Sequence, residues 1–74
     1  MKYQNVVEVD PEKLGGTPVF CGTRVPVQTF FDYLEDGESF EVFLDDFPTV
    51  SRAQLAALCG QMRTQVLSEY EVAA

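Results

Sequence analysis

Carboxylates are the groups in this sequence that are best placed to take part in chemistry, because acidic residues are numerous and histidine is absent. Two adjacent pairs, Glu35-Asp36 and Asp45-Asp46, offer oxygen ligands of the kind that a hard cation prefers. Neighbouring residues of a helix point in different directions, however, and no calcium-type loop of alternating aspartates occurs. We therefore interpret these pairs as parts of a solvated acidic face and predict no metal site.

Other residue patterns typical of enzymes are also missing from the sequence. Without histidine no side chain titrates naturally near neutral pH, and there is neither a glycine-rich phosphate loop nor a nucleophile beside a partner. Cys21 and Cys59 lie far apart and form no Cys-x-x-Cys motif, so we expect small buried hydrophobic residues in a reduced protein. The sequence predicts a non-enzyme with no catalytic residues and no cofactor.

The location of the chain can be predicted from its apolar runs. None approaches the roughly 20 residues needed to cross a bilayer. Residues 1–5 also lack the apolar region of a signal peptide. A cytoplasmic location without membrane contact is therefore expected.

The charge balance narrows the class of partner. Twelve acidic residues against five lysines and arginines give a net charge of -7. Phosphate backbones repel such a chain unless its few basic residues cluster, so a basic protein suits it better than a nucleic acid. With 74 residues the chain should form one domain, over 1–74, and a homodimer is expected because so small a core is marginal.

The segment 15–27 is the least helical part of the sequence. Its glycines and prolines surround apolar pairs, which predicts two short extended pieces joined at Cys21-Gly22-Thr23. Gly22 and Thr23 are expected to fix the shape of the turn, and valine in place of Gly22 should lower the melting temperature if Gly22 has a positive φ. Arg24 is the only charged residue of the segment, and it is either an ordinary surface arginine or a contact to a partner.

This segment resembles the signature of a family of small bacterial proteins catalogued as domain of unknown function 433. The family pattern reads Gly-Gly-x-Pro-hydrophobic-hydrophobic-x-Gly-Thr-Arg-hydrophobic-Pro-Val, and Gly15 to Val27 match it closely. The resemblance continues through Gly37-Glu38-Ser39, Asp46-Phe47-Pro48 and Ser51, and covers roughly Val7 to Leu58. It implies a homeodomain-like helical fold with an N-terminal β element, and a role as antitoxin beside PIN-like ribonuclease toxins.

Three helices are predicted, over 27–37, 39–47 and 52–70, after a β element and turns in residues 1–26. Ser39 and Ser51 are expected as N-caps, the latter in a capping box with Gln54. Gly37 should stop the first helix, and Asp10-Pro11 predicts a single helical turn over 12–14. Apolar residues recur with helical spacing at Val27, Phe30, Phe31 and Leu34, at Phe40, Phe43, Leu44 and Phe47, and at Leu55, Leu58, Cys59, Met62, Val66 and Tyr70.

The tight connection between the second and third helices suits a helix-turn-helix bundle, so the predicted fold class is mainly α. In that arrangement the third helix would enter a DNA major groove, with Arg52, Gln54 and Gln61 as the candidate nucleic-acid contacts. The preceding helix carries acidic residues where phosphates would need neutral or basic ones. A scaffold that uses its third helix for packing or dimerisation is therefore preferred.

These observations together predict a non-catalytic binding module. With the resemblance, the predicted role is an antitoxin that neutralises a PIN-like ribonuclease toxin, either by occluding its RNA-binding groove or by a basic side chain reaching its carboxylates. In that role DNA would be bound mainly in the complex with the partner. The alternatives are a helix-turn-helix DNA-binding transcriptional regulator that acts directly, and a scaffold in a larger assembly. The candidate partner-binding residues are Arg24, Thr23, Tyr33 and Arg63.

Overall fold

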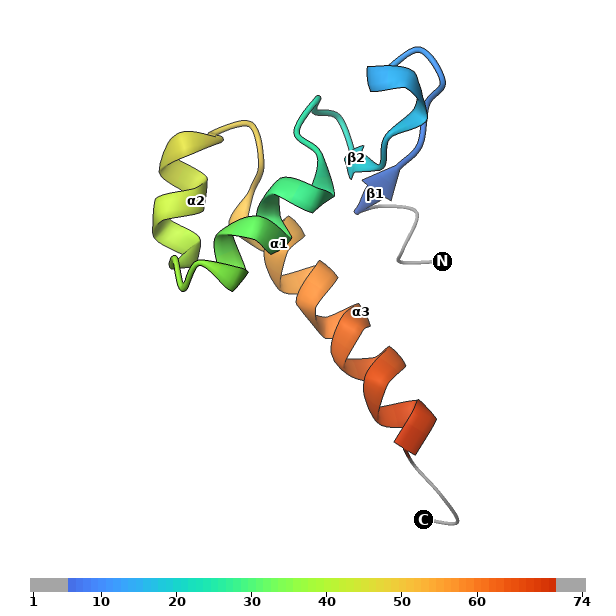
Figure 1. The fold of residues 1–74 in the computed structure, drawn as a ribbon, viewed down its shortest axis with the longest axis vertical. Coiled ribbons are helices and arrows are strands. Elements are labelled where there is room, and N and C mark those ends of the chain that lie inside the picture. Colours follow the sequence, from blue (N-terminus) through green and yellow to red (C-terminus); the bar gives the residue numbers. More distant parts are fainter. Residues whose placement is uncertain (1–5, 71–74) are drawn as a thin grey trace.

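A computed structural model describes residues 6–70 as a short β hairpin followed by three helices (Figure 1). Strand β1 (Val7–Glu8) pairs antiparallel with β2 (Val19–Phe20), and Val7 lies opposite Phe20. Helices α1 (Val27–Glu35), α2 (Phe40–Asp46) and α3 (Arg52–Tyr70) follow. The predicted fold, mainly helical with an N-terminal β element, is confirmed.

Local capping explains where α2 and α3 begin. Ser39 Oγ accepts the Val42 N–H at 3.2 Å, as expected of an N-cap. At the start of α3, Ser51 Oγ accepts the Gln54 N–H at 3.1 Å, while Gln54 Oε1 accepts the Ser51 N–H at 3.0 Å. This reciprocal pair is the predicted capping box, and it satisfies two backbone donors that a helix start would otherwise leave open.

The end of α1 and the turn before β2 differ from the prediction. Helix α1 ends at Glu35 rather than 37, because Gly37 at φ +79° lets the Glu38 N–H reach the Tyr33 carbonyl at 3.0 Å. The single helical turn predicted over 12–14 is wrong. A 3₁₀ turn spans Leu14–Gly16 instead, and all three of its residues have positive φ.

The core lies where β2, α1, α2 and the first half of α3 meet. Phe20, Phe30, Phe43 and Leu55 are each at most 1% exposed. The Phe30 ring centroid lies 6.2 Å from that of Phe20 and 5.3 Å from that of Phe43, both with edge-to-face geometry. Aromatic rings from the hairpin and two helices therefore interlock, and such pairs add to the free energy of burial itself.

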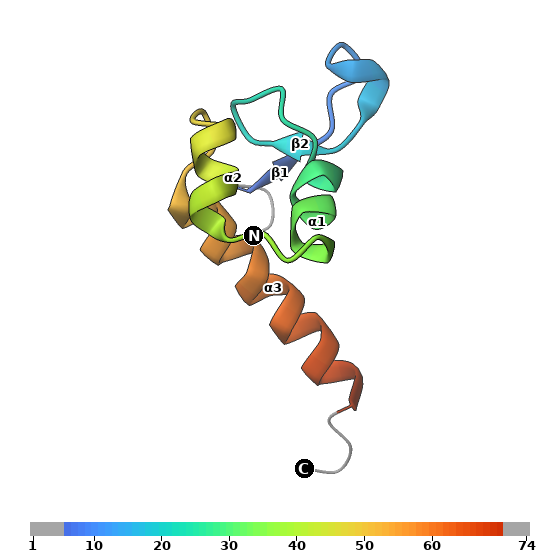
Figure 2. The same cartoon turned by 60° about the vertical axis from the view of Figure 1, so that its left-hand side comes forward.

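Only the first half of α3 belongs to this core. Leu55 and Leu58 are buried, whereas further along the same helix Met62 is 36%, Val66 52% and Tyr70 75% exposed. Figures 1 and 2 show that this second half extends beyond the hairpin, α1 and α2. The predicted apolar face of the third helix is therefore buried only in its first half and exposed to solvent in its second half.

Candidate functional site

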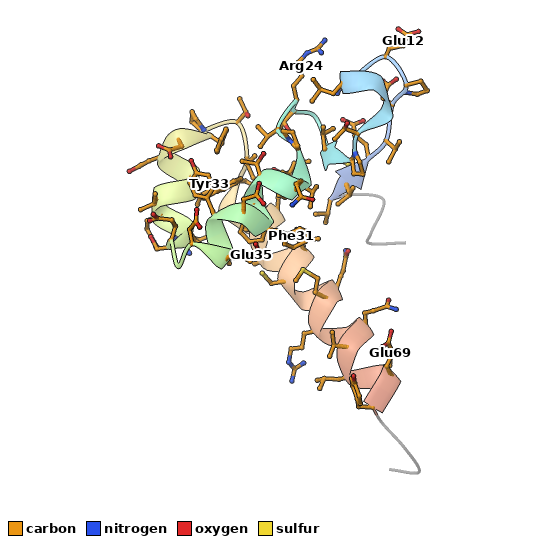
Figure 3. The ribbon with its side chains drawn as sticks, viewed as in Figure 1. Glu12, Arg24, Phe31, Tyr33, Glu35 and Glu69 are labelled. Atoms are coloured by element: carbon orange, nitrogen blue, oxygen red, sulfur yellow. The ribbon has the colours of Figure 1, made fainter. Side chains whose placement is uncertain are left out.

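The turn that joins β2 to α1 holds Thr23 inside the protein. Its side chain is 7% exposed, and its Oγ1 donates to the Phe20 carbonyl at 2.8 Å and accepts the Val25 N–H at 3.1 Å. The hydroxyl group therefore uses both its donor and its acceptor to stabilise the turn. Arg24 is exposed next to it, and Figure 3 shows its side chain directed away from the body of the protein. Of the two residues, Arg24 is the one that a partner can reach.

Glu8 ties this turn to the hairpin. Its Oε2 accepts the Gly22 N–H at 2.9 Å and forms an ion pair with Lys13 Nζ at 2.8 Å. The hydrogen bond from Lys13, followed by that from Gly22, lowers the pKa of Glu8 below its ordinary value. Gly22 has a φ of +77°, so the condition under which valine should destabilise the turn is met. The turn that carries Arg24 is therefore held by the contact of Glu8 with Gly22 and by the hydrogen bonds of Thr23.

Replacing Glu8 with Gln should flatten the acid dependence of stability. Because the folded-state pKa lies below the ordinary value of 4.5, the contribution of ionised Glu8 is fully present above pH 4.5. It is lost as the pH falls through the lowered folded-state pKa. Thermal melts at pH values from neutral to below 4.5 should show a steeper fall of Tm with falling pH in the wild type than in Glu8→Gln.

Glu12→Gln is the matched control for this experiment. It removes the same charge from a nearby exposed side chain, which points into solvent in Figure 3. Its melting profile should follow that of the wild type. If both variants flatten the profile equally, the contacts of Glu8 are not the cause.

Tyr33 joins α1 to α2. Its hydroxyl donates to Asp46 Oδ2 at 2.5 Å, and this hydrogen bond raises the pKa of Tyr33. Its ring centroid lies 5.1 Å from that of Phe43 and 5.8 Å from that of Phe47. The side chain is half-buried, so it orders the two helices and leaves only part of its surface for a partner.

The outer surface of α1 and α2 is acidic. Between Arg24 and Arg52 the sequence has no lysine or arginine, and every acidic side chain in that interval is exposed. We call this set the acidic face, and Glu35 is labelled in Figure 3 as one of its members. Its residues are Asp32, Glu35, Asp36, Glu38, Glu41, Asp45 and Asp46.

Of the three candidate nucleic-acid contacts, Arg52 is exposed, whereas Gln54 and Gln61 are half-buried. Arg52 forms an ion pair with Glu41, and its guanidinium lies 5.9 Å from the centroid of the Phe40 ring. Gln54, besides its capping role, donates from Nε2 to the Cys21 carbonyl at 3.0 Å. Gln61 is half-buried, and its Nε2 is buried without a hydrogen-bond partner among residues 6–70.

The basic residues within 6–70 fall into two groups, those in ion pairs and those outside them. Within residues 6–70, Lys13 and Arg52 form ion pairs, whereas Arg24 and Arg63 are exposed and form none. Arg24 belongs to the turn after β2, and Arg63 belongs to the projecting half of α3. The structure therefore places these two candidate partner-binding residues on separate elements rather than in one patch.

An apolar groove lies along α3 beside β1. It has a volume of about 330 Å³. The sequence pattern showed the α3 side of this groove but not the contribution of β1, because nothing in the pattern of residues 6–9 places that strand beside α3. The lining residues are Val7, Leu58, Gln61, Met62, Gln65 and Val66.

The described part of the chain offers neither a cluster of metal ligands nor a membrane-spanning helix. Over residues 6–70, no three His, Cys, Asp or Glu side chains gather closely enough to hold a metal ion. No helix in this range is both long and apolar enough to span a membrane. Cys21 and Cys59 are half-buried rather than fully buried, and burial raises the pKa of the Cys59 thiol.

Comparisons with known proteins point to one family. A family model described as "Protein of unknown function (DUF433)" matches residues 7–60. The chain is also similar to a solved DUF433 member protein from Anabaena variabilis, with 27% sequence identity and a TM-score of 0.65. That match covers 90% of this chain and 69% of the other. No curated protein matches the sequence.

Proposed function

We propose that this chain, which belongs to the DUF433 family of proteins of unknown function, is a non-catalytic binding module for a basic protein partner. In the sharper form of the proposal it is an antitoxin, and the partner is a PIN-like ribonuclease toxin. The observation that carries the proposal is the distribution of charge. Seven exposed carboxylates lie on α1, on α2 and in the segment between them, while two of the four basic residues within 6–70 are held in ion pairs.

The acidic face supports a basic partner through complementary electrostatics. A protein that binds RNA needs a positive groove, and an exposed acidic surface can steer towards such a groove and cover it. The same surface would be repelled by the phosphates of DNA or RNA. Because Glu41 already holds Arg52 in an ion pair, the other members of the face carry most of the charge that is available to a partner.

The rival proposal, a DNA-binding regulator, receives less support from the geometry. Reading base edges requires side chains that can leave the protein surface and enter a groove. Arg52 and Gln54 are engaged in contacts within the chain, and binding DNA would have to break them. The two exposed basic residues outside ion pairs, Arg24 and Arg63, are too few to neutralise many phosphates.

The test begins with capture of the tagged full chain from its native cytoplasm, with identification of retained proteins and then a ribonuclease assay. We expect a stoichiometric basic protein whose RNA cleavage is inhibited by the chain. The triple variant Asp32→Asn, Glu35→Gln, Asp36→Asn should release this protein at lower salt than the wild type. A control with Asp10→Asn and Glu12→Gln, away from α1 and α2, should retain it. Equal salt sensitivity of both variants, or retention of DNA alone, would count against the proposal.

A second expected result concerns Arg24. If its guanidinium reaches carboxylates of the captured ribonuclease, Arg24→Ala should weaken inhibition about tenfold or more, as expected for a charge-assisted hydrogen bond. Inhibition is measured as the concentration of the chain that halves RNA cleavage. Arg63→Ala, which removes the same charge from α3, serves as the comparison. Unchanged inhibition by Arg24→Ala would remove this mechanism and leave occlusion by the acidic face.

A further inference from the structure

The projecting half of α3 bears an apolar stripe that continues directly from the core. Leu55 and Leu58 are buried, and the stripe then proceeds through Met62, Val66 and Tyr70 at intervals of four residues. Each four-residue step turns the side chain by about 40° round the helix, so Met62 and Tyr70 each lie within about 40° of Val66 at the centre of the stripe. Tyr70, at 75%, is the most exposed of the large apolar residues within 6–70. No residue within 6–70 covers this part of the stripe.

The groove and the exposed aromatic lie on the same stripe. Val7, Leu58 and Met62 line the groove at the domain end of the stripe. Tyr70 stands two turns further along, at the far end. A self-complementary interface with two-fold symmetry needs a hollow and a projection on one surface, because each copy must offer both.

Charge on this part of the helix favours a second copy over a basic protein. Residues 53–70 contain one arginine, Arg63, and one acid, Glu69, so the segment is neutral within a chain of net charge -7. Two identical acidic chains can approach closely only through a neutral surface. For a basic partner, this segment offers one carboxylate, that of Glu69, as a complementary charge. In both views of the fold the projecting half points away from α1 and α2, which carry the acidic face.

We propose that this surface is a homodimer interface, in which the projecting halves of two α3 helices pack antiparallel about Val66. That register places Tyr70 of one copy beside Met62 and the groove of the other, and it does so twice. Contacts between an aromatic ring and a methionine sulfur are favourable. The acidic faces of the two copies then lie at opposite ends of the dimer. This proposal does not depend on the proposed function.

The test compares two valine substitutions that introduce the same charge on helices. Val66→Glu places a carboxylate at the centre of the proposed interface, while Val42→Glu places one on the exposed surface of α2, where Val42 is 40% exposed. Sedimentation of the full chain from micromolar to near-millimolar concentration should give a dimer, of twice 8.3 kDa, for the wild type and Val42→Glu. Val66→Glu should remain a monomer or associate at least tenfold more weakly, with unchanged helical circular dichroism.

A cross-linking measurement fixes the register independently. In the antiparallel arrangement the two copies of residue 66 meet at the two-fold axis, so Val66→Cys should form a covalent dimer under mild oxidation. Val42→Cys and the unsubstituted chain, which already contains Cys21 and Cys59, should form far less. A wild type that is monomeric at every concentration would overturn the proposal and leave the groove to its own chain or to another protein. A dimer that persists in Val66→Glu would overturn it equally.

Discussion

Phe30→Ala is expected to leave the chain largely unfolded at room temperature. Phe30 is 1% exposed, and its ring lies 5.3 to 6.2 Å from those of Phe20, Phe31, Phe40 and Phe43. Removing a buried phenylalanine costs about 3–5 kcal/mol in free energy of unfolding. A core of this size rarely supplies more than about 3–5 kcal/mol in total. Urea titration followed by circular dichroism measures the loss.

The neighbouring residue provides a matched control. Phe31 stands in the same helix and loses the same atoms in Phe31→Ala, but its side chain is only half-buried. It should therefore lose less than half as much free energy of unfolding, and the variant should remain folded. Equal losses at the two positions would mean that α1 does not present Phe30 to the core in solution.

Gly22→Val should lower the melting temperature through backbone strain. Gly22 has a φ of +77°, and a Cβ added there would meet no atom within 4 Å. The added Cβ itself therefore meets no obstacle, and the positive φ is the expected source of the loss. A residue with a branched Cβ at positive φ costs about 1–3 kcal/mol, and each kcal/mol corresponds to roughly 4–8 °C in Tm for a domain of this size. Thermal denaturation measures the shift.

Gly60→Ala replaces a glycine at a position where no backbone strain is expected. Gly60 lies inside α3 and likewise has no atom within 4 Å of an added Cβ, but its φ is not positive. Alanine there should raise stability by about 1 kcal/mol, because glycine is a poor helix former. The two glycines should thus shift Tm in opposite directions. A neutral Gly22→Val would show that the turn adopts another conformation in solution.

Features that depend on near neighbours in the sequence were predictable. The capping box of Ser51 and Gln54 and the N-cap at Ser39 involve residues three apart, and both are present as expected. The positive φ of Gly22 could also be inferred, because glycine between two extended pieces marks a turn. The fold class follows from such local signals, because the spacing of apolar residues marks each helix separately.

Features that join distant residues left no trace in the sequence pattern. Tyr33 was predicted as a partner contact, but its bond to Asp46 spans 13 residues and could not be inferred from either position alone. The contact of Glu8 with Gly22 spans 14 residues, so the fixed presentation of Arg24 was equally hidden. The 3₁₀ turn Leu14–Gly16 was missed for another reason, because Leu14 has a φ of +51°, which a non-glycine residue seldom adopts.

The hydrogen bond from Gln54 to the Cys21 carbonyl has a consequence for the order of folding. It closes a loop between residues 33 apart, and the entropy lost in closing such a loop must be offset before the contact stabilises anything. Gln54 is oriented by the first turn of α3, which forms locally and fast. We therefore expect the first turn of α3 to form first, and its contact with the turn between β2 and α1 to form only when the chain collapses.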